Sequence, residues 1–362
     1  MIIRLFVFWR VGLFIVGYLG SLAFPKVSNG GLGSIGSGQF NYLTSWAQWD
    51  GGHYFDIVKT GYLKDTDFAF FPLFPMLIKF ISNFFSGNII LSGLFISNVA
   101  FLIFLLIFFN YVAKISTKKS ALATVTSFLV FPTTFYAVAF YSESLFLLFV
   151  ASTFLFLKFG KYLNAAIFVA FASITRLMGL FLIVSLIYNY AASIKFKIKK
   201  INREIFHTSI AFFGFFTYVI YLWYKLDDPL RFLTIQSIWN RTVTDPISTV
   251  FSYFWAYLVG ESRPLNDFFD LATTLIFLII LILGRKKISS SLWIFSMLVV
   301  LIPVSTGTLT SMPRYVLSSL GAFIIIGKYL SDKPGLKITL WSVSLATQVY
   351  LLVRFINGYW VA

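Results

Sequence analysis

The chain has 362 residues, of which 59% are hydrophobic, 20% aromatic and only 12% charged. Soluble globular proteins are usually about 45–50% apolar and about 25% charged, so this composition excludes a soluble globular protein and predicts an integral membrane protein. There is no cysteine, and His53 and His207 are the two histidines, which excludes disulfides, thiol nucleophiles and histidine-built metal clusters. The net charge of +16 would suggest nucleic acid in a soluble protein, but in a membrane protein it more often marks basic cytoplasmic loops, and we expect no nucleic-acid partner.

Apolar runs of about 17–25 residues are typical of membrane-spanning helices. The first run, 5–24, has a basic start that would also suit a signal peptide. No small-x-small cleavage site follows, so an anchor helix is favoured. After a Gly/Ser-rich linker at 28–38 and a polar stretch, residues 68–85 are apolar but contain two prolines and Lys79. Since proline disrupts a helix interior, this segment is either a kinked span or a helix lying in the membrane interface.

The placement of basic residues decides between these alternatives. If 68–85 does not cross, the further spans are 88–112, 120–138, 142–157, 162–175, 177–192, 206–224, 267–284, 289–305, 314–329 and 338–357. With the N-terminus inside, sixteen basic residues then fall in inner loops: Lys114, Lys118, Lys119, Lys158, Lys161, Lys195, Lys197, Lys199, Lys200, Arg203, Arg285, Lys286, Lys287, Lys328, Lys333 and Lys337. This obeys the positive-inside rule, whereas a crossing by 68–85 would violate it in every later loop. We therefore predict eleven spans, with 162–175 and 177–192 short enough to form one bent pair.

The same topology gathers the acids on the outer side. Only Glu204 and Asp332 fall inside. The others lie outside or at the outer edge: Asp50, Asp56, Asp65, Asp67, Glu143, Asp227, Asp228, Asp245, Glu261, Asp267 and Asp270. We predict a single transmembrane domain over 1–362, with a first outer loop at 25–87 and a second long outer loop at 225–266.

The first outer loop carries the densest group of polar residues, WAQWDGGHYFDIVKTGYLKDTDFAFFPLFP from residue 46 to residue 75. If 46–60 is helical, Asp50, His53 and Asp56 share one face, and Gly61 would be a C-terminal cap. Asp50 is either a helix N-cap or a carboxylate base whose pKa is raised by partial desolvation and which accepts a proton from an acceptor hydroxyl.

The other polar residues of this loop have weaker assignments. His53 suits a hydrogen-bonding binder better than a proton shuttle. Asp56 and Asp67 are either substrate binders or solvated acids, and Asp65 is expected to be solvated.

Three later residues are candidates for chemistry. Glu143, in FPTTFYAVAFYSESLF, is an acid at the edge of an apolar segment, which is either functional or a helix N-terminal acid favoured by the macrodipole. Arg176 and Arg314 are isolated arginines at the outer ends of predicted spans. They either bind a phosphate with the bidentate guanidinium fork or snorkel toward lipid headgroups.

Motifs for soluble activated donors are missing. The sequence has no Walker loop and no Gly-rich dinucleotide fingerprint. A nucleotide-sugar or energy-coupled enzyme is therefore hard to support, and an activated donor would arrive as a membrane lipid.

Several blocks together resemble a known family. WDGGHYFDIVKTGY followed by FAFFPLFPMLIK is similar to the PIG-V family of integral-membrane mannosyltransferases, and FPTTFYAVAFYSESLF, SITRLMGL and MPRYVL resemble its later blocks in the same order. The resemblance covers residues 46 to about 320, and the first block is the most specific. Two positions depart from the family pattern. Asp67 stands where a glutamate is more usual, and Gly51 and Gly52 are smaller than the residues expected there.

The resemblance implies a GT-C fold, a catalytic first outer loop and an inverting, metal-independent transfer from a polyprenyl-phosphate sugar, typically mannose, with no cofactor. It implies Asp50 as catalytic base and Arg176 and Arg314 as donor-phosphate binders. The residues that it places around the sugar or acceptor are Trp49, His53, Asp56, Asp67 and Glu143. The acceptor would be a glycolipid, a glycan or a protein.

Two other function classes compete with this interpretation. A lipid or sugar transporter would use buried acids and arginines for gating, but it would need polar groups along a path through the midplane, and no internal repeat is evident. A structural scaffold would tolerate replacement of Asp50 and Arg314. The expected location is the cell membrane of a prokaryote or the endoplasmic reticulum of a eukaryote, with the site on the outer or luminal side.

Overall fold

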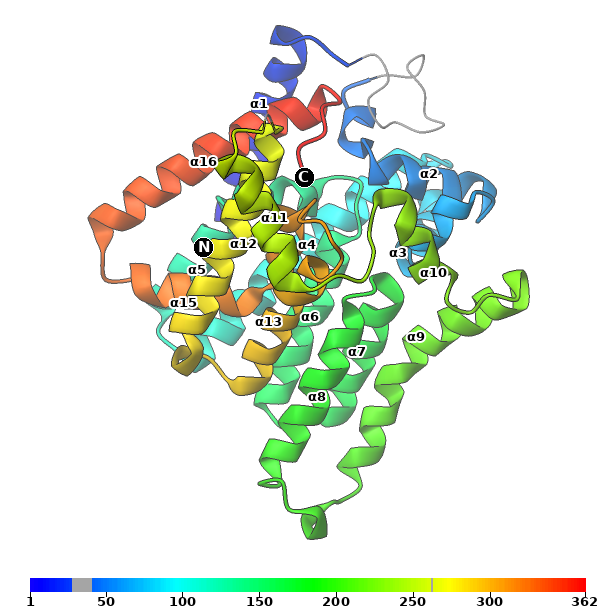
Figure 1. Cartoon of the computed structure of the whole chain (residues 1–362), viewed down its shortest axis with the longest axis vertical. Helices are drawn as coiled ribbons and strands as arrows, with labels where there is room; N and C mark the ends of the chain where they lie inside the picture. Colours follow the sequence, from blue (N-terminus) through cyan, green and yellow to red (C-terminus); the bar gives the residue numbers. More distant parts are fainter. Residues whose placement is uncertain (28–40, 262) are drawn as a thin grey trace.

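A computed structural model of the chain describes residues 1–27, 41–261 and 263–362, and all secondary structure in these ranges is helical (Figure 1). The predicted Gly/Ser-rich linker at 28–38 lies outside the described residues. Within the described ranges, five helices are long and apolar enough to cross a membrane: α1 (Ile2–Ala23), α4 (Ile89–Ile115), α9 (Glu204–Leu226), α12 (Leu265–Leu283) and α16 (Pro334–Ile356).

Shorter helices fill the remaining predicted spans. They are α5 (Lys118–Leu129), α6 (Glu143–Lys158), α7 (Tyr162–Thr175), α8 (Gly179–Ser193), α13 (Ser290–Val304) and α15 (Leu320–Leu330). The connecting segments contain η3 (Thr44–Ala47), α2 (Asp50–Thr60), η4 (Asp65–Ala69), α3 (Leu73–Ser82), η5 (Asn83–Phe85), η6 (Thr134–Val138), η7 (Ile198–Lys200), α10 (Arg231–Thr234), η8 (Ile235–Trp239), α11 (Pro246–Leu258), η9 (Arg285–Lys287), α14 (Met312–Tyr315) and η10 (Val316–Ser318).

Two predicted spans are not continuous helices. Helix α5 ends at Leu129, three residues before Pro132, and the chain continues as the 3-10 turn η6. The span predicted at 314–329 is instead α14, η10 and α15 in succession. Irregular backbone is tolerated at membrane depth only where protein surrounds it, and all five residues of η6 are buried. These broken segments therefore belong to the interior of the bundle, where they line the candidate site.

The proline-containing segment at 68–85 forms a short amphipathic helix. Helix α3 has ten residues, so it rises about 15 Å, half of the ~30 Å hydrocarbon core, and does not cross that core by itself. Pro72 precedes its first residue and Pro75 lies in its first turn, where the missing amide hydrogen costs little. One face is buried, including Phe74, whereas Met76 and Phe80 are exposed. This shape agrees with the predicted interfacial helix.

Small residues allow the helices to approach closely. Gly214 of α9 lies directly against the Ala170 backbone of α7, and an added Cβ would overlap that carbonyl. Close helix packing through small residues is typical of membrane bundles, where lipid offers no hydrophobic drive to associate.

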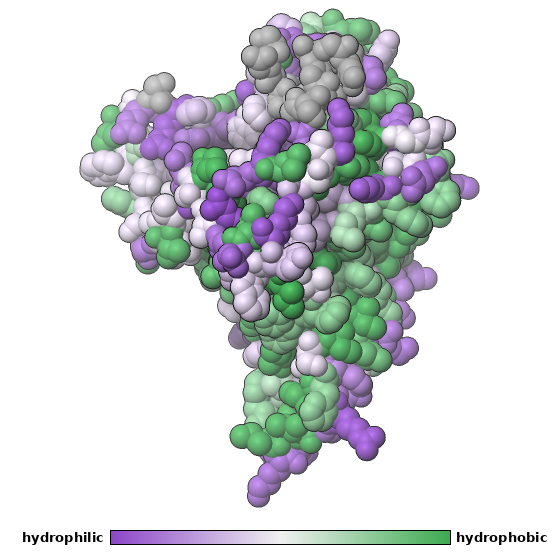
Figure 2. All heavy atoms as spheres, turned by 90° about the vertical axis from the view of Figure 1, so that its right-hand side faces the viewer, coloured by the Kyte–Doolittle hydropathy of each residue, from purple (hydrophilic) through white to green (hydrophobic). Residues whose placement is uncertain are grey.

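The surface has the polarity of a membrane protein. The connection between α8 and α9 forms one tip of the molecule, while α2 and α3 lie toward the other side (Figure 1). Figure 2 shows a broad hydrophobic surface between the hydrophilic atoms at that tip and the mixed surface above. Exposed side chains of α9 such as Phe206, Phe213 and Ile220 contribute to it. Apolar patches of this extent require a nonaqueous environment, so the protein is an integral membrane protein.

Candidate active site

The site begins where α2 begins. The helix predicted from residue 46 is interrupted: η3 ends at Ala47, Gln48 is extended, and Trp49 has a φ of 56° before α2 starts at Asp50. Positive φ in a bulky residue is strained and is often found at functional sites. The Trp49 indole donates a hydrogen bond of 3.3 Å to the Tyr359 carbonyl and packs edge-on against Trp360. The carboxyl-terminal segment thus holds the turn that aims Asp50.

This turn corrects one alternative for Asp50 and confirms a cap. Asp50 is the first residue of α2, and the N-cap is Trp49, so the interpretation of Asp50 as an N-cap is wrong. Its carboxylate makes a tertiary contact instead. Gly61 caps the end of α2 with a φ of 80°, as predicted.

Four charged residues from four segments form an ionic cluster, which consists of Asp50, Glu143, Arg176 and Arg314. Arg314 Nη2 donates to Asp50 Oδ2 at 2.6 Å and to Glu143 Oε1 at 2.8 Å. Arg176 Nη1 lies 2.8 Å from the same Glu143 oxygen. Glu143 therefore bridges the two arginines, and Arg314 bridges the two acids.

Exposure separates the members of the cluster. The side chains of Glu143 and Arg314 are each 5% exposed, that of Arg176 is 18% exposed, and that of Asp50 is 27% exposed. Burying an ion is costly unless it is paired, which the network satisfies for Arg314. Asp50 is the cluster's most accessible group.

Polar and aromatic residues of the η6 region support the cluster. The Arg314 guanidinium lies over the Tyr136 and Tyr141 rings, 4.8 and 5.0 Å from their centroids, a favourable cation–π arrangement. Ser142 accepts from Arg176 at 3.2 Å and shares a 2.7 Å hydrogen bond with the Tyr54 hydroxyl. From this block the sequence analysis predicted only Glu143 as a site residue and missed Tyr136, Tyr141 and Ser142. Their position just before that acid was the feature of the sequence that could have indicated them.

The protonation of Asp50 differs from the sequence-based expectation. Desolvation by itself would raise the pKa of Asp50, but the charge of Arg314 and its hydrogen bond outweigh that effect and hold the pKa below its ordinary value. The expectation of a raised pKa was wrong because the sequence does not reveal which cation reaches this carboxylate. Asp50 is ionised at neutral pH.

The other acids of the loop contact nearer partners. Asp56 lies 2.6 Å from the Lys64 ammonium, and Asp67 Oδ2 accepts from the Leu63 and Lys64 amides. His53 stacks on Phe70, and its Nδ1 lies 3.7 Å from Asp67 Oδ1.

Both Asp56 and Asp67 are buried, at 5% and 1% exposure, so the description of them as solvated acids is wrong. Asp65 is exposed, as expected, and pairs with Arg231 at 2.7 Å.

A buried acid that sequence reasoning left out of the site orients α14. Asp270, 3% exposed on α12, accepts a 3.1 Å hydrogen bond from the Met312 amide at the start of α14. From the second outer loop, Arg241 donates to Thr306 Oγ1 and to the Thr310 carbonyl. These contacts fix the turn that presents Arg314. The feature of the sequence that could have indicated this role is the position of Asp270, an acid within an apolar segment.

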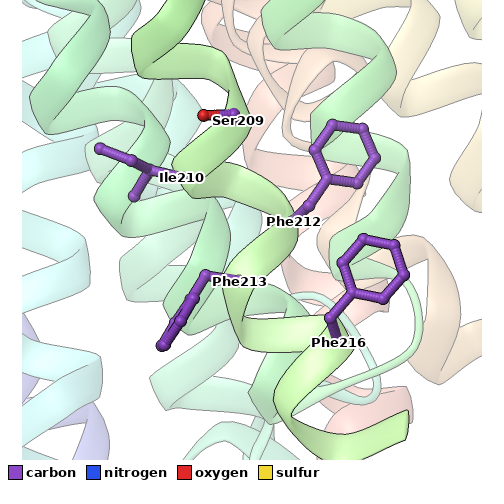
Figure 3. Close-up of a pocket in the computed structure, with 5 residues that line it drawn as sticks. All are labelled: Ser209, Ile210, Phe212, Phe213 and Phe216. Carbon is purple, nitrogen blue, oxygen red and sulfur yellow. The ribbon is translucent and has the colours of Figure 1, made fainter. Parts of the chain in front are cut away.

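Two further features complete the description of possible ligand sites. Among the described residues, no group of three or more His, Asp or Glu side chains is placed to hold a metal ion. An open hollow of about 710 Å³ lies on α9, lined by Ser209, Ile210, Phe212, Phe213 and Phe216 (Figure 3). The side chains that line this hollow are almost entirely apolar and lie on the hydrophobic surface. None of them belongs to the ionic cluster.

Comparison with solved structures identifies the fold. ArnT from Cupriavidus metallidurans bound to undecaprenyl phosphate matches with a TM-score of 0.58 and 13% identity over 94% of this chain and 62% of that one. Its apo state matches with a TM-score of 0.56 at the same identity and coverage. A weaker likeness, with a TM-score of 0.42 and 11% identity, is to the Archaeoglobus fulgidus oligosaccharyltransferase, over 96% of this chain and 53% of that one. The likeness to ArnT shows the GT-C fold, and this chain spans 62% of the length of that ArnT.

Comparison of sequences identifies the family. No curated protein matches the chain. Residues 2–221 match the family described as Mannosyltransferase (PIG-V), which is more than half of the chain. With the GT-C fold and the blocks quoted above, this match shows that the chain belongs to the PIG-V mannosyltransferase family.

Proposed function

We propose that this protein is a membrane glycosyltransferase that moves a hexose from a polyprenyl-phosphate donor to a hydroxyl of a glycolipid, glycan or protein acceptor. Mannose is the hexose that we favour. The observation that carries the proposal is the ionic cluster. An accessible carboxylate, Asp50, is paired with a buried arginine, Arg314, within a fold shared with a protein that was solved with undecaprenyl phosphate.

The proposed chemistry is a single inverting displacement. The Asp50 carboxylate takes the proton of the acceptor hydroxyl as that oxygen attacks the anomeric carbon from the face opposite the phosphate. The bond between the anomeric carbon and the phosphate oxygen breaks, and the electron pair leaves with the lipid phosphate. Arg314 and Arg176 stabilise the charge that develops on this phosphate, which accelerates the reaction where the interaction is stronger in the transition state. The two arginines supply the positive charge that stabilises the leaving phosphate, so the proposed mechanism needs no metal ion.

Sharing of Arg314 couples donor binding to the base. In the structure its guanidinium holds both Asp50 and Glu143, so an incoming donor phosphate would compete with Asp50 for the same donor atoms. When Arg314 turns to the phosphate, Asp50 loses the charge that lowers its pKa, and its pKa rises toward that of an ordinary aspartate. A stronger base is thus formed only when the donor is present, because a higher pKa improves proton acceptance.

The remaining residues form the surroundings of the reacting groups. We assign Trp49 and His53 to the sugar or acceptor, since both adjoin Asp50 on the same turn and helix. Asp56 and Asp67, which were predicted to bind substrate, are assigned here to the shape of the loop because their carboxylates hold Lys64 and its amide. The reaction takes place on the outer or luminal side, opposite the lysine-rich loops.

The test is transfer of radiolabelled mannose from polyprenyl-phosphate mannose in purified membranes that contain the wild type, Asp50→Asn or the control Asp65→Asn. The asparagine of the first variant keeps the size and removes the base, so we expect a loss of about a hundredfold or more. Asp65 is an exposed acid in the same loop, so its variant should keep its activity. Equal transfer by wild type and Asp50→Asn would remove Asp50 from the mechanism. No transfer by any protein, with every acceptor mixture, would point first to another donor sugar and then to a transporter.

A further inference from the structure

A second hollow, which has a largely polar lining, lies at the end of the bundle opposite the ionic cluster. It measures about 360 Å³, and its lining includes four lysines, Lys158, Lys286, Lys287 and Lys328. Helix α6 runs between the two sites, because Glu143 is its first residue and Lys158 its last. Sixteen residues of α-helix rise about 24 Å, so this basic hollow is remote from the ionic cluster and near the other face of the membrane.

The lysines of the basic hollow converge from three parts of the chain. Lys158 ends α6, Lys286 and Lys287 belong to η9, and Lys328 lies in the last turn of α15. The Lys328 ammonium donates a 2.7 Å hydrogen bond to the Lys287 carbonyl, which draws one lysine against the backbone of another. Like charges gathered in this way repel.

No acid offsets that charge among the described residues. No aspartate or glutamate lines the basic hollow, and none of its four lysines forms an ion pair in the described part of the chain. At the same end of the bundle, Lys119 does have an acidic partner, Asp332, at 2.7 Å. The basic hollow is therefore a concentration of positive charge that lacks a protein counter-ion.

Hydrogen-bond donors and apolar groups complete the lining. Ser289 and Ser291 lie at the start of α13, where the helix dipole also favours an anion, and Asn189 donates to Ser291. Phe154 and Leu157 contribute an apolar wall. At about 30 Å³ per water, the volume would hold roughly a dozen waters, enough for a phosphate with its immediate substituents but too little for a whole lipid.

We propose that the basic hollow binds the phosphate of an anionic phospholipid headgroup from the leaflet opposite the ionic cluster. Its position at helix ends matches the depth of lipid phosphates. Basic pockets between transmembrane helices are suited to anionic headgroups. The positive-inside rule explains why lysines are abundant at this end, but it does not require them to converge on one hollow.

The experiment compares two fourfold lysine variants of the full chain in detergent. The variant of the basic hollow is K158Q/K286Q/K287Q/K328Q. The matched control is K195Q/K197Q/K199Q/K200Q, which removes the same charge from exposed lysines of the connection between α8 and α9. Native mass spectrometry measures the preference for phosphatidylglycerol over phosphatidylcholine with the same acyl chains. We expect the preference to fall about tenfold or more in the first variant and to persist in the control.

Three results would overturn the proposal. The first is an equal loss of preference in both variants, which would mean that the whole basic face attracts lipid. The second is no preference in the wild type. The third is displacement of the lipid by millimolar inorganic phosphate, which would indicate a free-anion site. If the fourfold variant does not fold, K158Q/K286Q, which changes two exposed side chains, should still reduce the preference. An unchanged preference in that pair would also contradict the proposal.

Discussion

Apart from the exposed Asp65, the acids of the first outer loop are of two kinds, which differ in how far their partners lie along the chain. Asp50 pairs with Arg314, 264 residues away, and Glu143, which lies outside this loop, pairs with the same arginine across 171 residues. Asp56 pairs with Lys64 across eight residues, and Asp67 holds the Lys64 amide across three. The distant pairs form only when the whole bundle is assembled, whereas the near pairs need only the loop itself.

This difference separates two roles within one motif. An ion pair between distant elements brings chemically active groups into one place, and here it leaves Asp50 partly accessible. A pair within the loop shapes the support for those groups. Replacing members of each kind, one at a time, should therefore affect transfer and stability in different proportions.

The largest effect is expected for Arg314→Gln. This change leaves Asp50 and buried Glu143 without their shared cation, so the free energy of unfolding should fall by about 3–5 kcal/mol. Transfer should fall by about a hundredfold to a thousandfold, as when a donor to the transition state is removed. Thermal unfolding in detergent and the mannose-transfer assay measure the two losses.

A double variant controls the stability part of that prediction. In Arg314→Gln, Glu143 keeps its pair with Arg176, whereas Asp50 loses the cation it is paired with. Adding Asp50→Asn to Arg314→Gln removes that unpaired charge, so part of the lost stability should return. A midpoint of unfolding that Arg314→Gln leaves unchanged would contradict the importance of the distant pair.

The next largest effect is expected for Glu143→Gln alone. Both guanidinium groups remain, but they lose the charge that holds them together, so stability should fall by about 1–3 kcal/mol. Transfer should fall less than in Arg314→Gln, since Asp50 and Arg314 can still pair. A loss larger than that of Asp50→Asn in the same assay would instead make Glu143 the base.

The pH profile sharpens the comparison for Asp50. Its pKa is lowered in the folded protein. Asp50 is therefore the ionised base above that pKa, and activity is lost as the pH falls through it and the carboxylate is protonated. We expect kcat/KM, which reports the free enzyme, to stay level from neutral pH down to about 4, the ordinary range of aspartate. The acid limb of kcat should lie at higher pH, because the donor phosphate draws Arg314 away. An acid limb of kcat/KM near pH 6 would show that Arg314 does not control the base.

The smallest effect is expected for Asp67→Asn. The amide oxygen of asparagine can still accept from the Leu63 and Lys64 backbone, so the loss of stability should be about 1 kcal/mol and transfer should stay close to wild type. Steady-state kinetics for donor and acceptor check this. A strongly raised KM for either substrate would return Asp67 to the group that binds the sugar or acceptor.

The sequence by itself determined the elements whose cause is local. Apolar length predicted α1, α4, α9, α12 and α16, because a run of such residues cannot remain in water. The C-terminal cap at Gly61 followed from the freedom of glycine at positive φ. The quoted blocks also pointed to Asp50, Glu143, Arg176 and Arg314 one by one.

Only the tertiary structure decided how those residues meet. The positive φ of Trp49 depends on the carboxyl-terminal Tyr359 and Trp360. The presentation of Arg314 depends on Asp270 from another helix. The sign of the pKa shift of Asp50 follows from a cation 264 residues away. Desolvation and charge act in opposite directions on a partly buried carboxylate, so its protonation is a property of the assembled bundle and cannot be deduced from its neighbours in the chain.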